Sequence, residues 1–154
     1  MSSARRNMHN GNVRIERLLE SKMIEADKNM FFSLGFESEL PHVAEECDRL
    51  STSYVEDVRR LGRLLLANGC NPRLNINTEL TSVCLSRDAD SKAPYSAVSV
   101  LKYNLSSLKK MIEYSKRLIS EDSLSCFDGV AEELNRVILR DIVSLERIRD
   151  FITV

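Results

Sequence analysis

The sequence predicts an all-α protein that folds as a four-helix bundle with one long connection between the second and third helices. Four segments repeat apolar residues at steps of three and four, which is the period of an amphipathic α-helix. The second and third segments are separated by the stretch from Gly69 to Pro94, roughly 25 residues, whereas helices in bundles are usually joined by about 2–8 residues. A connection of this length can cross from one end of a bundle to the other. We therefore expect the second and third helices to run parallel.

The first helix is predicted over residues 13–34. Its apolar face is expected to consist of Ile15, Leu19, Met23, Ala26, Met30 and Leu34. Residues 1–12 end in the polar run His9-Asn10-Gly11-Asn12 and are predicted to be a flexible tail. A single domain is expected over residues 13–154, because domains commonly contain about 100–150 residues.

The second helix is predicted over residues 41–68, because proline is favoured in a first helical turn and Pro41 stands at its start. Its apolar stripe is the most regular in the chain and consists of Val43, Cys47, Leu50, Tyr54, Val58, Leu61 and Leu65. Asn68-Gly69 is expected to end the helix, and Asn71-Pro72 prevents its continuation.

The third and fourth helices are predicted over residues 95–119 and 127–152, with a polar break between them. The inward residues of the third are expected to be Val98, Leu101, Leu105, Leu108, Ile112 and Ile119. Those of the fourth are expected to be Phe127, Leu134, Ile138, Ile142, Leu145, Ile148 and Ile152. The long connection contains Leu80, Val83 and Leu85, so we expect it to pack along the bundle.

Composition argues against several classes of partner. The chain has 22 Lys+Arg and 23 Asp+Glu, a formal net charge of −1, which gives no electrostatic reason to expect nucleic acid or anionic lipid. Its longest aliphatic run, Leu64-Leu65-Leu66, is far shorter than the ~20 residues that span a membrane, and no signal peptide is visible. The four cysteines are scattered without a Cys-x-x-Cys pair, which favours reduced thiols in a cytoplasmic protein.

Three stretches resemble the bacterioferritin family of the ferritin-like superfamily. Asn29-Met30-Phe31-Phe32 resembles the Asn-Gln-Tyr-Phe of the family's first helix, and residues 63–72 resemble the end of its second helix with the Gly-x-Pro turn beyond. Ile138-Leu139-Arg140-Asp141 resembles the Ile-Leu-Arg-Asp that enters the family's last metal motif. The resemblance covers about residues 13–151 and implies a ferritin-like bundle with a long crossover.

The family's di-iron ferroxidase centre takes a Glu from each of two helices and a Glu-x-x-His from each of the other two. By the resemblance these positions fall on Ile24 with Glu25 beside it, on Ser53 and Glu56 or Tyr54 and Asp57, on Leu101, and on Ile142 and Leu145. Most ligands are therefore missing, and the centre is predicted to be degenerate and inactive as a ferroxidase. The weak candidates for metal ligands are Glu20, Glu25, Glu56 and Asp57. No catalytic or cofactor-binding residue is predicted.

Neither a haem site nor a metal site at the Glu-x-x-His sequence is expected. The family's haem-binding methionine is replaced by Tyr54 or Val55, so haem is not expected. A literal Glu-x-x-His occurs from Glu39 to His42, but Pro41 marks a helix start, so Glu39 and His42 should not share a regular helical face.

The sequence is compatible with two functions. The resemblance implies a bacterioferritin-like protein of iron storage and iron homeostasis, with iron as its possible cofactor. The aliphatic residues at the ligand positions favour instead a metal-free helical scaffold or interaction module. A homodimer is the expected minimum assembly, because Phe31 and Phe32 are left over on the first helix. The family's closed shell of 24 subunits is the less favoured alternative, because Phe151-Ile152-Thr153-Val154 leaves no residues for the fifth helix that lines some of its channels.

Overall fold

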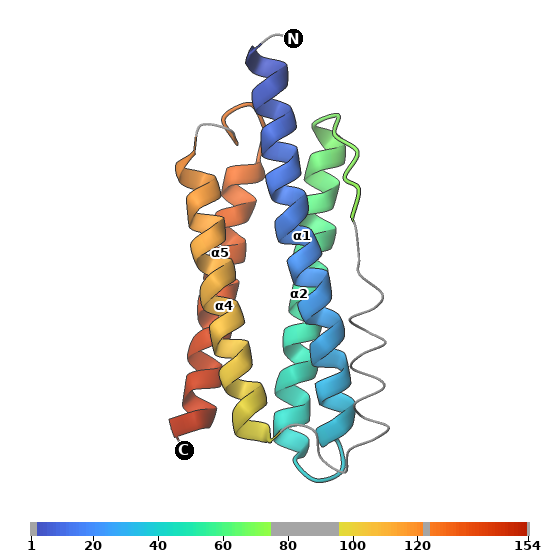
Figure 1. The fold of residues 1–154 in the computed structure, drawn as a ribbon, viewed down its shortest axis with the longest axis vertical. Coiled ribbons are helices and arrows are strands. Elements are labelled where there is room, and N and C mark those ends of the chain that lie inside the picture. Colours follow the sequence, from blue (N-terminus) through green and yellow to red (C-terminus); the bar gives the residue numbers. More distant parts are fainter. Residues whose placement is uncertain (1–2, 75–95, 122–123, 154) are drawn as a thin grey trace.

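The computed structural model describes residues 3–74, 96–121 and 124–153, and these residues form four α-helices and no strand. The helices are α1 (Ser3–Phe36), α2 (Pro41–Ala67), α4 (Ala97–Ser120) and α5 (Val130–Thr153), and they pack side by side along one axis (Figure 1). The prediction of an all-α four-helix bundle is confirmed.

The contacts between helices give their directions. A short connection over residues 37–40 joins α1 and α2 into an antiparallel hairpin (Figure 1). Near the start of α1 the Tyr114 hydroxyl donates to the Arg14 carbonyl, and further along α1 Asn29 pairs with Asn104. The earlier residue of α1 contacts the later residue of α4, so these two helices are antiparallel. Because α2 is also antiparallel to α1, α2 and α4 run in the same direction. The predicted connection itself, with Leu80, Val83 and Leu85, falls mostly on residues 75–95, outside the described residues.

The N-terminal boundary of the first helix differs from the prediction. Helix α1 begins at Ser3, so residues 3–12, expected as a tail, form its first turns. Met8 packs against the core, Gly11 is buried, and the Asn12 amide donates to Glu16 Oε1 at 2.8 Å. The polar run is therefore part of the helix, since Met8 and Gly11 pack against the bundle and Asn12 bonds to a residue one turn further along α1.

The start of α5 is also later than predicted. Phe127 lies in a turn before the helix, and its amide donates to the Leu124 carbonyl at 3.1 Å. Gly129 follows with a φ of 77°, a conformation that glycine adopts without a steric penalty, and α5 begins at Val130.

The core confirms the predicted stripe of α2 and most of that of α5, but the predicted face of α1 is partly wrong. Met30 and Leu34 are exposed by 45% and 62%, and on α4 Val98 is exposed by 52%. Ile15, Leu19 and Ala26 are buried as predicted, and Leu18, Lys22 and Asn29 are buried beside them. The prediction was partly wrong there because polar residues occupy some of the inward positions of α1. A prediction made from apolar residues alone cannot identify such positions.

Candidate functional site

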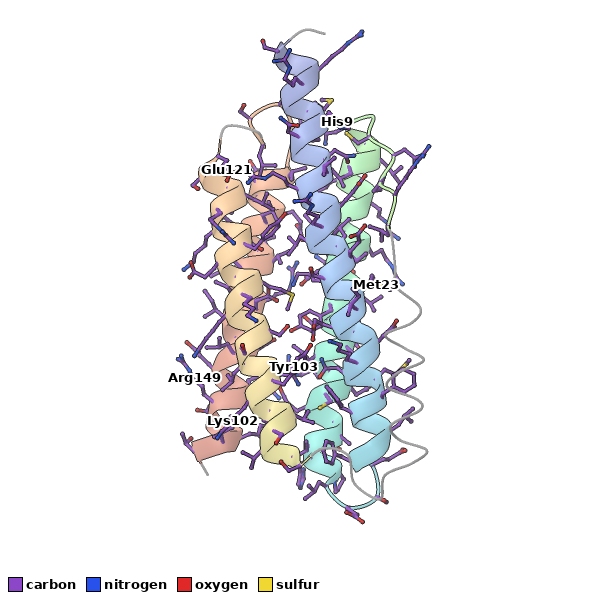
Figure 2. All side chains as sticks on the ribbon, in the orientation of Figure 1. His9, Met23, Lys102, Tyr103, Glu121 and Arg149 are labelled. Atoms are coloured by element: carbon purple, nitrogen blue, oxygen red, sulfur yellow. The ribbon has the colours of Figure 1, made fainter. Side chains whose placement is uncertain are left out.

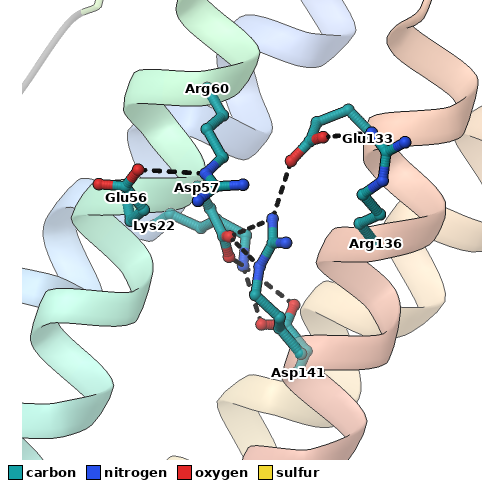
Figure 3. A network of polar contacts seen from close by, with 8 residues as sticks. Lys22, Glu56, Asp57, Arg60, Glu133, Arg136 and Asp141 are labelled. Atoms are coloured by element: carbon teal, nitrogen blue, oxygen red, sulfur yellow. Dashed lines mark hydrogen bonds and ion pairs between the residues drawn. The ribbon is translucent and has the colours of Figure 1, made fainter.

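A buried ion-pair network lies in the middle of the bundle, where α1, α2 and α5 face one another (Figure 3). The Nζ atom of Lys22 lies 3.0 Å from Asp57 Oδ2 and 2.9 Å from Asp141 Oδ2. The three side chains are 0%, 0% and 1% exposed. Burying a charge costs several kcal/mol unless it is paired, so each of these groups depends on the others.

The network continues from the interior to the surface through Arg140 (Figure 3). Its Nε donates to Asp57 Oδ1 at 2.8 Å, and its Nη2 donates to Glu133 Oε1 at 2.9 Å. Arg136, on the outer surface of α5, donates to the other oxygen of Glu133 at 2.9 Å. Two cations, Lys22 and Arg140, thus balance Asp57 and Asp141, which makes the innermost part of the network neutral.

The charge states of these groups follow from burial and pairing. Burial, together with the nearby charge of Asp57, raises the pKa of Asp141 to about 6, although Lys22 and Arg140 oppose the shift. Burial also raises the pKa of Tyr54, whose ring lies 4.9 Å from the Lys22 ammonium nitrogen. Burial acts on Glu133 in the same direction, but hydrogen bonds from Arg136 and Arg140 hold its pKa below the usual value.

A second polar layer joins α1 to α4. Asn29 and Asn104 exchange side-chain hydrogen bonds of 3.1 and 2.8 Å, and both side chains are buried. Tyr103, which Figure 2 places on the side of α4 nearer α1, donates to Glu25 Oε1 at 2.6 Å and accepts from Lys28 at 2.7 Å. This layer fixes the register of α1 against α4 by directional bonds.

A third cluster lies nearer the C-terminal end of α5. Glu46 is 4% exposed and accepts from Arg147 at 3.1 and 3.2 Å and from Arg49 Nε at 3.0 Å. Burial raises the pKa of Glu46, but the two guanidinium groups outweigh that effect and lower it overall. These bonds tie α2 to α5.

The predicted ligand candidates are not gathered at one place. Asp57 lies in the central network, whereas Glu56, on the next position of α2, is 41% exposed and pairs with Arg60 at 3.1 Å (Figure 3). Glu25 bonds to Tyr103 in the second layer, and Glu20 is half-buried on α1.

On α1, α4 and α5, the positions that the resemblance assigned to metal ligands are occupied by aliphatic residues. Leu101 and Leu145 are buried, and Ile24 and Ile142 are half-buried. Both histidines are exposed and lie far apart along the bundle: His9 lies towards the N-terminal end of α1, as labelled in Figure 2, and His42 in the first turn of α2.

The residues at the centre do not fit a di-iron site. Two inward carboxylates, Asp57 and Asp141, are already bridged by the Lys22 ammonium, and a fixed cation at that place repels a second one. Across the described ranges, no group of three or more His, Cys, Asp or Glu side chains is arranged to hold a metal ion.

Sequence reasoning missed Lys22, Arg140 and Asp141 as members of one network. A signal was present, because Lys22 lies three residues after Leu19 and four before Ala26, on the buried face of α1. A lysine at such a position requires a buried anion, and the acids of α2 and α5 are the available partners.

A cavity of about 570 Å³ opens beside the network and gives it contact with solvent. Thr52, Ser53 and Glu56 of α2 line it together with Arg140 of α5. The outer cation of the network is therefore reachable from solution, whereas Lys22 is sealed beneath it.

Comparisons with protein-family models, with curated proteins and with solved structures find no match to this chain. In the part of the chain that the structure describes, none of the helices combines the length and the apolar character needed to cross a membrane.

Proposed function

We propose that this chain is a ferritin-like bundle in which ion pairs take the place of a metal centre, and that it acts as a helical scaffold rather than as a ferroxidase. The observation that carries the proposal is Lys22, whose ammonium nitrogen lies 3.0 Å from Asp57 and 2.9 Å from Asp141. This group supplies the positive charge that buried carboxylates otherwise take from a metal. A ferrous ion would have to displace a cation that is covalently attached to the chain.

The surrounding residues support the same proposal. Leu145 is 7% exposed, and Ile142 packs against the core beside it. Burial of such aliphatic side chains stabilises a fold by about 1.5–3 kcal/mol each, whereas an unpaired carboxylate there would destabilise it. The interior is therefore built for stability without metal.

The ferritin-like part of the proposal rests on helix direction and on the resemblance. Helices α2 and α4 run in the same direction (Figure 1), as a bundle with one long crossover requires. The stretch from Ile138 to Asp141 resembles the residues that lead into the family's last metal motif, and here it contributes Arg140 and Asp141 to the ion-pair network.

Bacterioferritin-like iron storage is the second candidate, and the helix directions favour it as well. In that case the chain would be an inactive subunit of an assembly whose other subunits oxidise iron. The central network would then serve only to keep this subunit folded.

A homodimer is part of the proposal, and α5 offers a surface for it. Leu139 and Val143 are exposed by 63% and 55% on the face of α5 opposite the core. Arg136 and Glu146 flank this pair on the same face, one helical turn to each side. In an antiparallel pairing of two α5 helices, Arg136 of one copy would meet Glu146 of the other around the apolar centre.

The test of the functional proposal is an anaerobic Fe(II) titration followed by oxygen-consumption measurements on purified protein. We expect no rapid oxygen uptake and less than one iron retained per chain in protein purified without chelators. The variant Lys22→Met removes the internal cation and is the matched comparison, with Lys28→Met as the control for loss of a lysine on α1. Rapid oxidation of two irons per wild-type chain would overturn the proposal, while stable association with active ferritin subunits would favour the second candidate.

A further inference from the structure

The groove between α1 and α4 is lined by positive charges that have no ion-pair partner among the residues that the structure describes. Arg17 of α1 and Lys110 and Arg117 of α4 border a cavity of about 310 Å³. Within the described part of the chain, none of these three side chains has a carboxylate within 4.0 Å. On α2 and α5, by contrast, most of the arginines are paired: Arg49, Arg59, Arg60, Arg136, Arg140 and Arg147 each contact a carboxylate.

The charged side chains of α4 are almost all basic. Between Ala97 and Ser120 the helix carries Lys102, Lys109, Lys110, Lys116 and Arg117 against Glu113 as its only acid. The net charge of −1 for the whole chain hides this segregation. Cations held close together without counter-ions repel one another, and an anion bound between them would relieve that repulsion.

Helix geometry separates two rows of cations on α4. Lys110 and Arg117 follow Tyr103 at seven-residue steps, so they share the side of α4 that Tyr103 turns towards α1. Lys109 and Lys116 follow Lys102 in the same way, and Figure 2 shows Lys102 on the outer side of the helix. The first row borders the groove and the second lies beside it.

The floor of the groove is apolar. Leu18 and Met111 are 1% and 5% exposed and form its base, and Tyr114 forms a wall. The Arg117 guanidinium carbon lies 5.8 Å from the centroid of the Tyr114 ring, which holds this cation at the edge of the groove. The Tyr114 hydroxyl is itself fixed by its bond to the Arg14 carbonyl at 2.7 Å.

A groove with cations around an apolar floor suits a ligand that has an anionic part and an apolar part. We propose that the α1–α4 groove binds a small organic anion in which a phosphate or carboxylate group is joined to a compact apolar group. Arg17, Lys110 and Arg117 would bind the anionic group, and Leu18 and Met111 would contact the apolar part. A volume of about 310 Å³ lies at the lower end of the range for small-molecule sites, about 300–1,000 Å³, which favours a small ligand over a macromolecule.

The experiment is a calorimetric titration of the full chain with phenyl phosphate at low ionic strength, where screening is weak. The groove variant is Arg17→Gln with Lys110→Gln and Arg117→Gln. The matched control is Lys102→Gln with Lys109→Gln and Lys116→Gln, which changes the net charge equally. We expect at least about tenfold weaker binding in the groove variant, equivalent to about 1.4 kcal/mol, and no more than about a twofold change in the control.

Two further measurements test the two parts of the ligand. Inorganic phosphate should bind more weakly than phenyl phosphate, because it leaves the apolar floor uncovered, and equal affinities would overturn the apolar part of the proposal. Vesicles of phosphatidylcholine with phosphatidylserine test a lipid head group as the source of the anion. If the wild-type chain and the control variant bind these vesicles and the groove variant does not, the lipid head group binds in this groove.

Several outcomes would overturn the proposal. These are the absence of saturable phenyl phosphate binding by the wild-type chain, equal weakening in both triple variants, and equal loss of vesicle binding in both. Circular dichroism melting shows whether the variants remain folded. If the groove variant is unfolded, the single exposed substitution Lys110→Gln replaces it, and unchanged affinity in that variant would also contradict the proposal.

Discussion

Lys22 and Asp57, which are 35 positions apart in the sequence, form an ion pair of 3.0 Å in which neither side chain is exposed. Asp141 completes the contact from α5 at 2.9 Å. The contact between Lys22 and Asp141 therefore ties the hairpin of α1 and α2 to the hairpin of α4 and α5 at the centre of the bundle. Because this bond is buried and directional, it restricts how the two hairpins can slide past each other.

Replacing Lys22 by Met should destabilise the protein strongly. The substitution gives an unbranched apolar side chain that is one atom shorter and leaves Asp57 and Asp141 buried without their shared cation. Removing one partner of a buried pair costs about 3–5 kcal/mol. Urea denaturation followed by circular dichroism measures the free energy of unfolding. Lys28→Met, at a partly exposed lysine of the same helix, should cost much less. A loss below about 1 kcal/mol in Lys22→Met would contradict the role given to the network.

Stability should rise as the pH falls from about 6 to 4.5, and Asp141 should be the cause. Burial raises its pKa from the ordinary value of 3.8 to about 6 in the folded protein, so the folded state binds more protons than the unfolded state between these two pH values. Folding is therefore favoured by protonation in this window, and the gain is lost as the pH rises through about 6. Glu46 and Glu133 act in the opposite sense, but they do so below the ordinary glutamate pKa of 4.5, because their pKa values are lowered in the folded protein.

The variant Asp141→Asn tests this assignment by denaturation at several pH values. It should abolish the rise in stability between pH 6 and 4.5, because no proton is taken up at that position. Glu56→Gln, at a carboxylate that is 41% exposed, is the control and should leave the pH profile unchanged. An identical pH profile in wild type and Asp141→Asn would show that another group titrates in this window.

The sequence was sufficient to predict the four helices that the described residues form and the stripe of α2, where apolar residues recur without interruption. It was not sufficient for α1, because Lys22 and Asn29 occupy inward positions that apolar periodicity does not register. Their burial depends on partners such as Asp57 and Asn104, which only the tertiary fold brings near. The same holds for the α1–α4 groove, whose charges come from two helices and cancel in the composition of the whole chain.

The cysteines should differ sharply in reactivity. Burial, with a smaller contribution from the charge of Glu46, raises the pKa of Cys47 to about 12, so almost no thiolate forms near neutral pH. Cys70 and Cys126 are half-buried, and we propose that all the thiols are reduced in a cytoplasmic setting. Brief alkylation with iodoacetamide followed by peptide mass spectrometry should label Cys70 well before Cys47. Equal labelling of native protein would contradict the burial of Cys47; Cys84 lies outside the described residues.

The Phe31 and Phe32 side chains, from which a dimer was predicted, are not the best candidates for its interface. Both are half-buried, and the Phe32 ring packs edge-on against Tyr103 with centroids 6.2 Å apart. Leu139 and Val143 on α5 are exposed instead, so any dimer is expected to form there.

Light scattering at several protein concentrations should give a dimer for wild type and a monomer for Leu139→Glu. The substitution places a charge at the apolar centre of the proposed α5 pairing, where it would be buried without a partner against Val143 of the second copy. Leu66→Glu is the matched control, because Leu66 is 58% exposed on α2 and should not affect assembly. Arg136→Glu should weaken the dimer, and adding Glu146→Arg should restore it by exchanging the two charges. A wild-type chain that is monomeric at every concentration removes the dimer, and equal dissociation by Leu66→Glu would place the interface elsewhere.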